Sequence, residues 1–280
     1  MQNKILTIGP ITKDIIITPQ SRNSQTGGSV FYQSKALHLI NTPHDVVLTI
    51  ADDDLKLLNS FDSQENIKTI ITKQTMQYTN IYDESMQRTQ KATLPENPIG
   101  IDNIKDINLS QYHTAIISPL CEYDIPPETI KYLKQNNLKT TIVAQGYLRS
   151  TDKDGNIKRH EWNNKDAYLK YADTIILDDE ETKKAFNLNE ITDDNINEIL
   201  KKYDIETFII TKASKGSTIY MQDMKTDIPC IKAEKIVDPT GLGDTYIAAY
   251  TSKIMENKSV YEAGIFAAEM AKEKIEIKYQ

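Results

Sequence analysis

The chain has 280 residues, 39% of them hydrophobic, and its 33 basic and 40 acidic side chains give a formal net charge of −7. An acidic chain lacks the positive charge that non-specific nucleic-acid binding requires. No stretch reaches the roughly 18 apolar residues of a membrane span, and the first ten residues contain no signal-peptide core. Cys121 and Cys230 are too few for a disulfide framework or a cysteine metal site. We therefore expect a cytoplasmic protein with no nucleic-acid or membrane partner.

The first third of the chain alternates apolar runs with glycine-containing turns. We expect strands at 5–8 and 14–18, a helix at 29–40, a strand at 46–50 and a helix at 52–59. Between 67 and 94, polar and apolar residues alternate, as in the segment 75–82. A period of two predicts antiparallel strands with one wet face, so this segment is expected to form a small β excursion.

The rest of the chain returns to strands separated by helices. The expected strands are 113–117, 139–144, 173–177, 207–211, 217–221 and 228–236, and the expected helices are 127–136, 162–171, 179–186, 193–203, 244–256 and 259–273. A turn is expected at Asp154-Gly155. Strands that alternate with helices predict βαβ units, and hence an α/β fold with a parallel sheet.

Glycine is scarce, with only 10 residues, about half of the usual share of ~7%. Four of the ten lie in two clusters, Gly27-Gly28 and Gly241-Leu242-Gly243. Glycine permits positive φ angles and close backbone approach. We therefore expect both clusters to need it.

The second cluster opens an apolar helix, in the segment Asp238-Pro-Thr-Gly-Leu-Gly-Asp244. The N-terminus of a helix offers unpaired N–H groups and a partial positive charge, which favour an anion. A carboxylate at Asp244 would then take a proton from a substrate hydroxyl during phosphoryl transfer. On these residues alone, an ordinary helix cap is the stronger interpretation.

In its context, this segment resembles the C-terminal signature of the ribokinase-like (PfkB-type) carbohydrate kinases, with Leu242 where alanine is usual. The resemblance implies that Asp244 is the catalytic base and that Gly241, Leu242 and Gly243 form the anion hole. It covers about 1–275 and implies a three-layer α/β/α fold, one domain over 1–280 with a largely parallel sheet. The family's β lid would come from about 11–19 and 67–94, and its edge would allow a homodimer.

Segments nearer the N-terminus follow the family's order. Asp14 is similar to the substrate-binding aspartate, and Gly27-Gly28 with Gln33 resembles the segment that bends around the sugar. Without the family, an exposed position at a strand edge is favoured for Asp14. For the two glycines, a plain turn and a segment that bends around the sugar are about equally supported. Arg149, at the end of Gln-Gly-Tyr-Leu-Arg, would contact substrate or phosphate, or would be a solvated loop charge, and the loop charge is favoured.

Two further segments resemble the parts of the family's site that bind the phosphate donor. Asp178 and Glu181 resemble the family's Asn-x-x-Glu, which implies Mg²⁺ held through water, although acids also suit a helix N-terminus. The stretch from Thr211 to Gly216 resembles the nucleotide-phosphate loop. In that loop Ala213 replaces the first glycine, so we expect the loop to differ. The nucleotide side would also include Thr240, Lys212 and Ala267, although solvation of Lys212 and simple helix packing of Ala267 remain open.

These residues and the resemblance predict an ATP- and Mg²⁺-dependent kinase that phosphorylates a hydroxyl of a small sugar, polyol or nucleoside. The chain contains no P-loop, dinucleotide-binding or protein-kinase motif. Departures from the family at Leu242, Asp178 and Ala213 leave open a non-catalytic ligand-binding or sensor protein on the same fold. A vitamin-precursor kinase of the same superfamily fits Asp14 and the lid less well.

Overall fold

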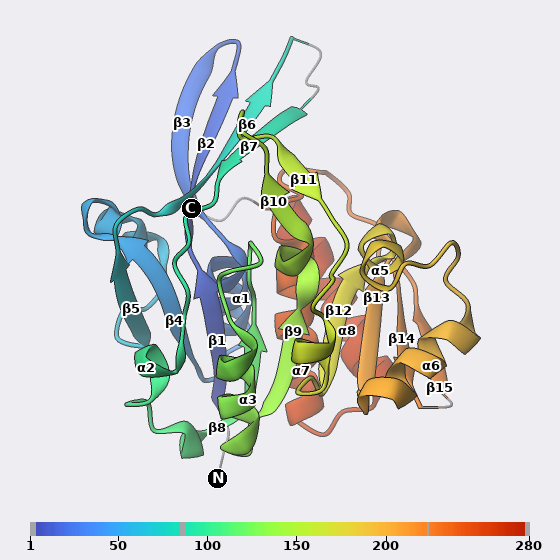
Figure 1. Ribbon diagram of the computed structural model, residues 1–280. Helices are drawn as coiled ribbons and strands as arrows, with labels where there is room; N and C mark the ends of the chain where they lie inside the picture. Colours follow the sequence, from blue (N-terminus) through green and yellow to red (C-terminus); the bar gives the residue numbers. More distant parts are fainter. Residues whose placement is uncertain (1–3, 85–87, 223, 278–280) are drawn as a thin grey trace.

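A nine-stranded sheet forms the centre of the computed structural model, which describes residues 4–84, 88–222 and 224–277 (Figure 1). In spatial order its strands are β15 (Met224–Ile228), β14 (Ser217–Met221), β13 (Thr207–Thr211), β12 (Thr174–Asp178), β9 (Lys139–Val143), β8 (Tyr112–Ile117), β1 (Lys4–Pro10), β4 (His44–Ala51) and β5 (Ile67–Thr72). From β13 to β5 all neighbours pair in parallel, whereas β14 and β15 are antiparallel. The expected parallel sheet is confirmed.

Helices cover both faces of this sheet (Figure 1). One face carries α1 (Ser29–Leu39), α7 (Leu242–Met255) and α8 (Val260–Glu276), and the other carries α2 (Ile101–Ile104), α3 (Pro127–Gln135), α4 (Asp166–Leu169), α5 (Asp179–Phe186) and α6 (Asp193–Tyr203). Short 3₁₀ turns are η1 (Asp52–Ser60), η2 (Leu109–Gln111), η3 (Ala144–Leu148) and η4 (Ala213–Lys215). Among the described residues, no helix is long and apolar enough to cross a bilayer.

The central strands explain why three layers form. In β12, Ile175 and Leu177 pack in the core with Leu200 of α6, whereas Ile176 packs on the opposite face with Ile247 of α7. Successive side chains of a strand point to opposite faces, so a continuously apolar strand must be covered on both sides. The α/β/α arrangement follows from these runs.

A second sheet forms the lid at the top of Figure 1. Its strand order is β3 (Ser21–Gly27), β2 (Thr12–Thr18), β6 (Met76–Tyr82) and β7 (Arg88–Thr93). The expected boundaries need two corrections. Residues 67–72 form β5, which pairs with the buried strand β4 in the large sheet. Strand β3 was not predicted, because its polar sequence has no apolar alternation. Residues 85–87 of the expected segment lie outside the described part of the chain.

Three smaller differences also bear on the site. The strand expected at 228–236 does not form. The strand β15 lies before it and ends at Ile228, because Pro229 has no N–H group to continue the ladder. The helix expected at 162–171 is reduced to α4, and the one at 52–59 is the 3₁₀ turn η1. The predicted turn at Asp154-Gly155 connects the hairpin β10 (Arg149–Thr151) and β11 (Ile157–Arg159). The other predicted elements lie within a few residues of their expected positions.

Candidate active site

The first turn of α7 lies beside the carboxyl ends of the parallel strands, the usual position of a ligand site in an open α/β sheet. Gly241 precedes the helix and has a φ of 77°, in the left-handed region that glycine adopts freely. A Cβ atom at Gly241 would collide with the ring of Tyr32, whereas one at Gly243 would meet nothing within 4 Å. Glycine is therefore required at 241, and at 243 it leaves the turn open.

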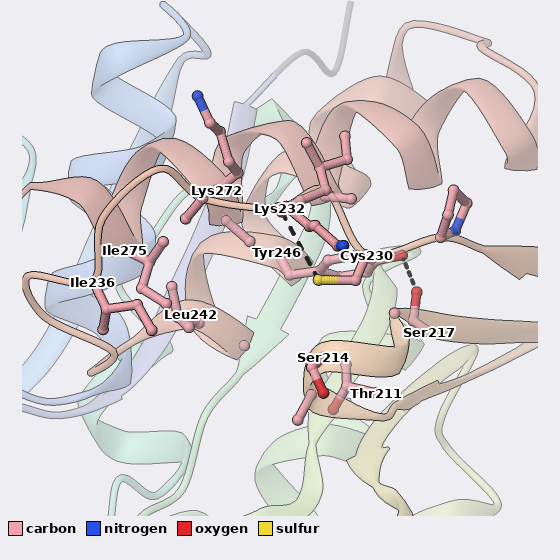
Figure 2. A pocket seen from close by; sticks show the side chains of 18 of the residues that line it. Thr211, Ser214, Ser217, Cys230, Lys232, Ile236, Leu242, Tyr246, Lys272 and Ile275 are labelled. Carbon is pink, nitrogen blue, oxygen red and sulfur yellow. Dashed lines mark hydrogen bonds between the residues drawn. The ribbon is translucent and has the colours of Figure 1, made fainter.

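A cavity of about 660 Å³ opens on one side of this turn, and we call it the larger cavity. Figure 2 shows its walls, which come from α7, α8, the turn after β13 and the irregular segment after β15. The walls are mostly apolar, and the lining residues are Asp178, Thr211, Ala213, Ser214, Gly216, Ser217, Pro229, Cys230, Ile231, Lys232, Ala233, Ile236, Leu242, Gly243, Tyr246, Ala268, Ala271, Lys272 and Ile275.

A second cavity of about 260 Å³, the smaller cavity, lies on the other side and is more highly charged. Its lining includes Asp178, Glu181, Asp244, Arg149 and Arg159. Four residues line both cavities, namely Asp178, Thr211, Leu242 and Gly243. The two spaces therefore meet at the first turn of α7.

Asp244 lies in this first turn and is almost completely buried. Its Oδ1 atom has no hydrogen-bond partner, which is rare for a buried carboxylate oxygen. Burial raises the pKa of Asp244 to about 6, while a hydrogen bond with Ser29 and the charge of Arg149 oppose the rise. The N-cap position of α7 is Gly241, and no side chain caps the helix. The interpretation of Asp244 as an ordinary helix cap is therefore wrong.

Arg149 begins β10 and points into the smaller cavity rather than into solvent. Its Nη2 atom donates a 2.7 Å hydrogen bond to Gln145 and lies 3.6 Å from Oε1 of Glu181. Only 19% of its side chain is exposed. The favoured interpretation, a solvated loop charge, is wrong because the guanidinium is enclosed between acidic and amide groups.

Asp178 and Glu181 form a reciprocal capping box at the start of α5. The amide of Glu181 donates to Oδ1 of Asp178 at 2.6 Å, and the amide of Asp178 donates to Oε2 of Glu181 at 3.1 Å. The helix-terminus interpretation is thus confirmed, yet both residues also line the smaller cavity. Burial, and next the charge of Asp178, raises the pKa of Glu181.

Two carboxylates on the wall of the smaller cavity fit Mg²⁺, which binds through few carboxylates, retained waters and substrate phosphates. Among the residues that the structure describes, no three His, Cys, Asp or Glu side chains gather as a possible metal site. An ion at Asp178 and Glu181 would therefore need phosphate and water oxygens as its other ligands.

The donor-side loop has a left-handed residue at the position where alanine replaces the family's first glycine. Ala213 has a φ of 47°, so alanine adopts there a conformation that glycine adopts more easily. Thr211 and Gly216, which are predicted to contact nucleotide phosphate, line the larger cavity. Lys212 lines neither cavity, and its ammonium donates to Thr218 at 2.6 Å.

Two other residues that were predicted to contact the nucleotide line neither cavity. Ala267 is fully buried in the helical core, because the helix turns Ala268, Ala271 and Ile275 toward the larger cavity instead. Thr240 is exposed, and its amide donates to Asp238. The sequence prediction also missed the cavity wall at 229–236, where the only signal is exposed apolar side chains such as Ile236.

On the acceptor side, Asp14 lies within β2 between β3 and β6, and only 5% of it is exposed. It accepts a 2.7 Å hydrogen bond from Thr12, and a Cβ atom on Gly27 would collide with its carboxylate. Burial raises the pKa of Asp14 to about 6. The interpretation of Asp14 as an exposed edge residue is therefore wrong, and glycine at position 27 is needed for the close approach of this carboxylate.

Two other features complete this side. Gln33 is fully buried, donates to Ser118 at 2.7 Å and leaves its Oε1 atom without a partner. Tyr32 is buried, and its ring packs on Gly241. Burial, and then the negative charges of Asp14, Asp238 and Asp244, raise the pKa of its phenol.

The fold has close relatives among solved structures. A sulfate complex of a pyrophosphate-dependent kinase in the ribokinase family superposes with a TM-score of 0.81 at 20% identity, over 97% of this chain and 95% of that one. Arabidopsis thaliana ribokinase complexed with ribose and ATP gives a TM-score of 0.80 at 17% identity, over 99% and 94%. The fold is ribokinase-like, as predicted.

The sequence itself assigns the family. Residues 62–278 match the pfkB family of carbohydrate kinases, and the chain belongs to this family. A nucleoside kinase of Methanocaldococcus jannaschii is 33% identical over 143 residues, which are 51% of this chain and 46% of that protein. The chain spans about half the length of this nucleoside kinase and of other curated relatives that it matches.

Proposed function

We propose that the protein transfers a phosphoryl group from a nucleoside triphosphate to a hydroxyl group of a small sugar, polyol or nucleoside. The observation that carries this proposal is the unpartnered Oδ1 of Asp244, buried where the two cavities meet. Family membership supports the same chemistry.

Asp244 is suited to act as the general base. A carboxyl group with a pKa of about 6 is mostly ionised at neutral pH and still accepts a proton more readily than an exposed aspartate. The first N–H groups of a helix have no intrahelical acceptors. The amides of Gly241, Leu242 and Gly243 would therefore stabilise the charge on the transferred phosphoryl group.

The larger cavity supports a nucleotide as donor. Its apolar walls, from Ile231 to Ile236 and along α8, suit a base and a ribose, whereas inorganic pyrophosphate would leave them unused. Thr211 and Gly216 line the end of this cavity nearest α7. Asp178 and Glu181 would hold Mg²⁺ through water, and the ion would neutralise charge on the donor phosphates.

The acceptor would bind under the lid. Asp14 is a buried carboxylate that suits paired hydroxyl groups, and the free Oε1 of Gln33 is a further acceptor of hydrogen bonds. Ribokinase and nucleoside kinase relatives act on such polyhydroxy molecules, as their names state.

A panel of sugars, polyols and nucleosides, offered with Mg-ATP and separately with Mg-pyrophosphate, tests this proposal. We expect ADP release with at least one acceptor, and little transfer from pyrophosphate. The Asp244→Asn variant should lose turnover by orders of magnitude and still bind ATP. Ligand-induced thermal stabilisation without ADP release from any acceptor would instead indicate the sensor function.

The homodimer through the lid stays a prediction. Strand β3 forms an outer edge of the lid sheet and carries mostly polar residues. Size-exclusion chromatography with light scattering would test it, and a monomer at all concentrations would contradict it.

A further inference from the structure

A fully buried lysine lies behind the phosphate turn, by which we mean residues 238–243. Lys274 of α8 has no exposed surface. Its Nζ atom lies 3.2 Å from the carbonyl oxygen of Asp238 and 3.1 Å from Oδ2 of the same residue. Lysine is almost never fully buried unless it is paired. Here one ammonium group binds both the main chain and the side chain of Asp238.

The carboxylate of Asp238 also contacts the main chain just before Gly241. Its Oδ2 atom accepts from Lys274, while its Oδ1 atom accepts from the amide of Thr240 at 3.0 Å. The carboxylate therefore joins the buried ammonium to the residue directly before the left-handed Gly241.

Main-chain contacts fasten the start of the turn to the same helix. The amides of Val237 and Asp238 donate to the carbonyl oxygen of Ile275 at 2.8 Å and 3.2 Å. The side chain of Ile275 lines the larger cavity, as Figure 2 shows, whereas Lys274 reaches the turn. One end of α8 thus contacts both the donor cavity and the phosphate turn.

Tyr32 completes the enclosure of the lysine. The Nζ atom of Lys274 lies 5.4 Å from the centre of the Tyr32 ring, within the range of a cation–π interaction. The same ring packs on Gly241. Tyr32 belongs to α1, which starts after Gly28 on the acceptor side.

We propose that Lys274 is a positioning residue for phosphoryl transfer, whose buried ammonium holds Asp238 and so keeps the amides of Gly241, Leu242 and Gly243 directed at the transferred group. This inference rests on the proposed function, because it assigns Lys274 a part in that reaction. Oxyanion-type stabilisation depends on donors that are already in place before the reaction. Loss of the lysine should therefore slow the transfer step and leave ground-state binding nearly unchanged.

The test compares Lys274→Met, which keeps the length of the side chain without its charge, with the wild type. We expect kcat to fall at least about tenfold, with the KM of acceptor and ATP within about twofold. In hydrogen–deuterium exchange, the amides of 237–241 should exchange faster, with other core peptides unchanged. The control is Lys253→Met, because Lys253 pairs with Glu256 at the opposite end of α7.

A second comparison covers the case in which Lys274→Met does not fold, since it leaves a buried carboxylate without its partner. The double variant Asp238→Asn/Lys274→Met lacks both charges and is compared with Asp238→Asn alone. Because Lys274 acts through Asp238, both variants should be slower in kcat than the wild type and should differ from each other by less than about twofold. A wild-type kcat in either variant, a double variant far slower than Asp238→Asn, or unchanged exchange at 237–241 would overturn the proposal.

These outcomes are separate from those of the proposed function. A wild-type protein that transfers phosphate to no acceptor would refute the function. The exchange measurement would still decide whether Lys274 holds the phosphate turn, because it needs no turnover.

Discussion

The guanidinium of Arg149 lies 3.6 Å from the carboxylate of Glu181, and both side chains line the smaller cavity with Asp244. Arg149 lowers the pKa of both acidic groups, against the effect of their burial. It therefore favours the ionised forms of the proposed base and of the candidate Mg²⁺ ligand, and it supplies positive charge where phosphate would lie.

We expect Arg149→Met to lower kcat/KM by about 10²-fold, because removing one donor to the transition state has an effect of this order. Steady-state kinetics with the identified acceptor would measure it. Arg22→Met, in the exposed strand β3, is the control and should be unaffected. An Arg149→Met enzyme as active as the control would contradict a role at the phosphate.

The activity should depend on pH through Asp244. The base works as the carboxylate, and its pKa is about 6, so kcat should rise from pH 5 and level off above pH 7. At pH 5 it should be about one tenth of its plateau, because one pH unit below the pKa leaves about a tenth of the group ionised. A kcat profile that is flat from pH 5 to pH 8 would exclude this assignment.

Asp244→Asn should also stabilise the fold near neutral pH. The pKa of Asp244 is raised in the folded state, so the folded protein binds this proton more tightly than the unfolded chain does. The contribution of this carboxyl to stability is present below pH 4 and is lost as the pH rises to 6. We therefore expect the variant to gain on the order of 1–3 kcal/mol at pH 7.5 and almost nothing at pH 4. Denaturant titrations at the two pH values measure the difference, and equal gains at both would contradict it.

Gly27→Ala should weaken acceptor binding in particular. The new Cβ atom would collide with the carboxylate of Asp14 and approach the hydroxyl of Thr12. We expect the KM of the acceptor to rise by about tenfold or more, with the KM of ATP unchanged, because the displaced group is the proposed ligand of the acceptor and not of the nucleotide. Gly100→Ala is the control, since its nearest new contact is Asn103 at 3.8 Å. Parallel changes in both KM values would refute a local effect.

Ala213 offers a test of the donor loop. A left-handed alanine carries a steric cost of about 1 kcal/mol, which glycine would remove while adding flexibility to the unfolded chain. Ala213→Gly should therefore be nearly neutral, whereas Ala213→Val should destabilise the protein by more than about 1 kcal/mol, because β-branched residues tolerate this region poorly. Thermal unfolding would measure both. Ser214→Val, at the next position, where the backbone is not left-handed, is the control.

Much of the architecture could be predicted because local patterns determine it. Strands that alternate with helices predicted a parallel sheet, and β12 and β13 lie where strands were expected at 173–177 and 207–211. Strands β3 and β5 were misjudged for a physical reason. The side chains of β3 are polar, and pairing with β2 holds this strand in the lid sheet. Strand β5 pairs with β4 at the edge of the large sheet, and its local sequence does not indicate which sheet it joins.

The sequence by itself determined the phosphate turn, since Gly241 must be glycine at a left-handed position and Asp244 follows in the first turn of a helix. Only the tertiary structure decided what surrounds it. Burial of Asp14, enclosure of Arg149 and pairing of Lys274 with Asp238 join segments far apart in the chain. A local pattern reports which conformation a segment prefers, but burial and charge pairing depend on which distant segments pack against it.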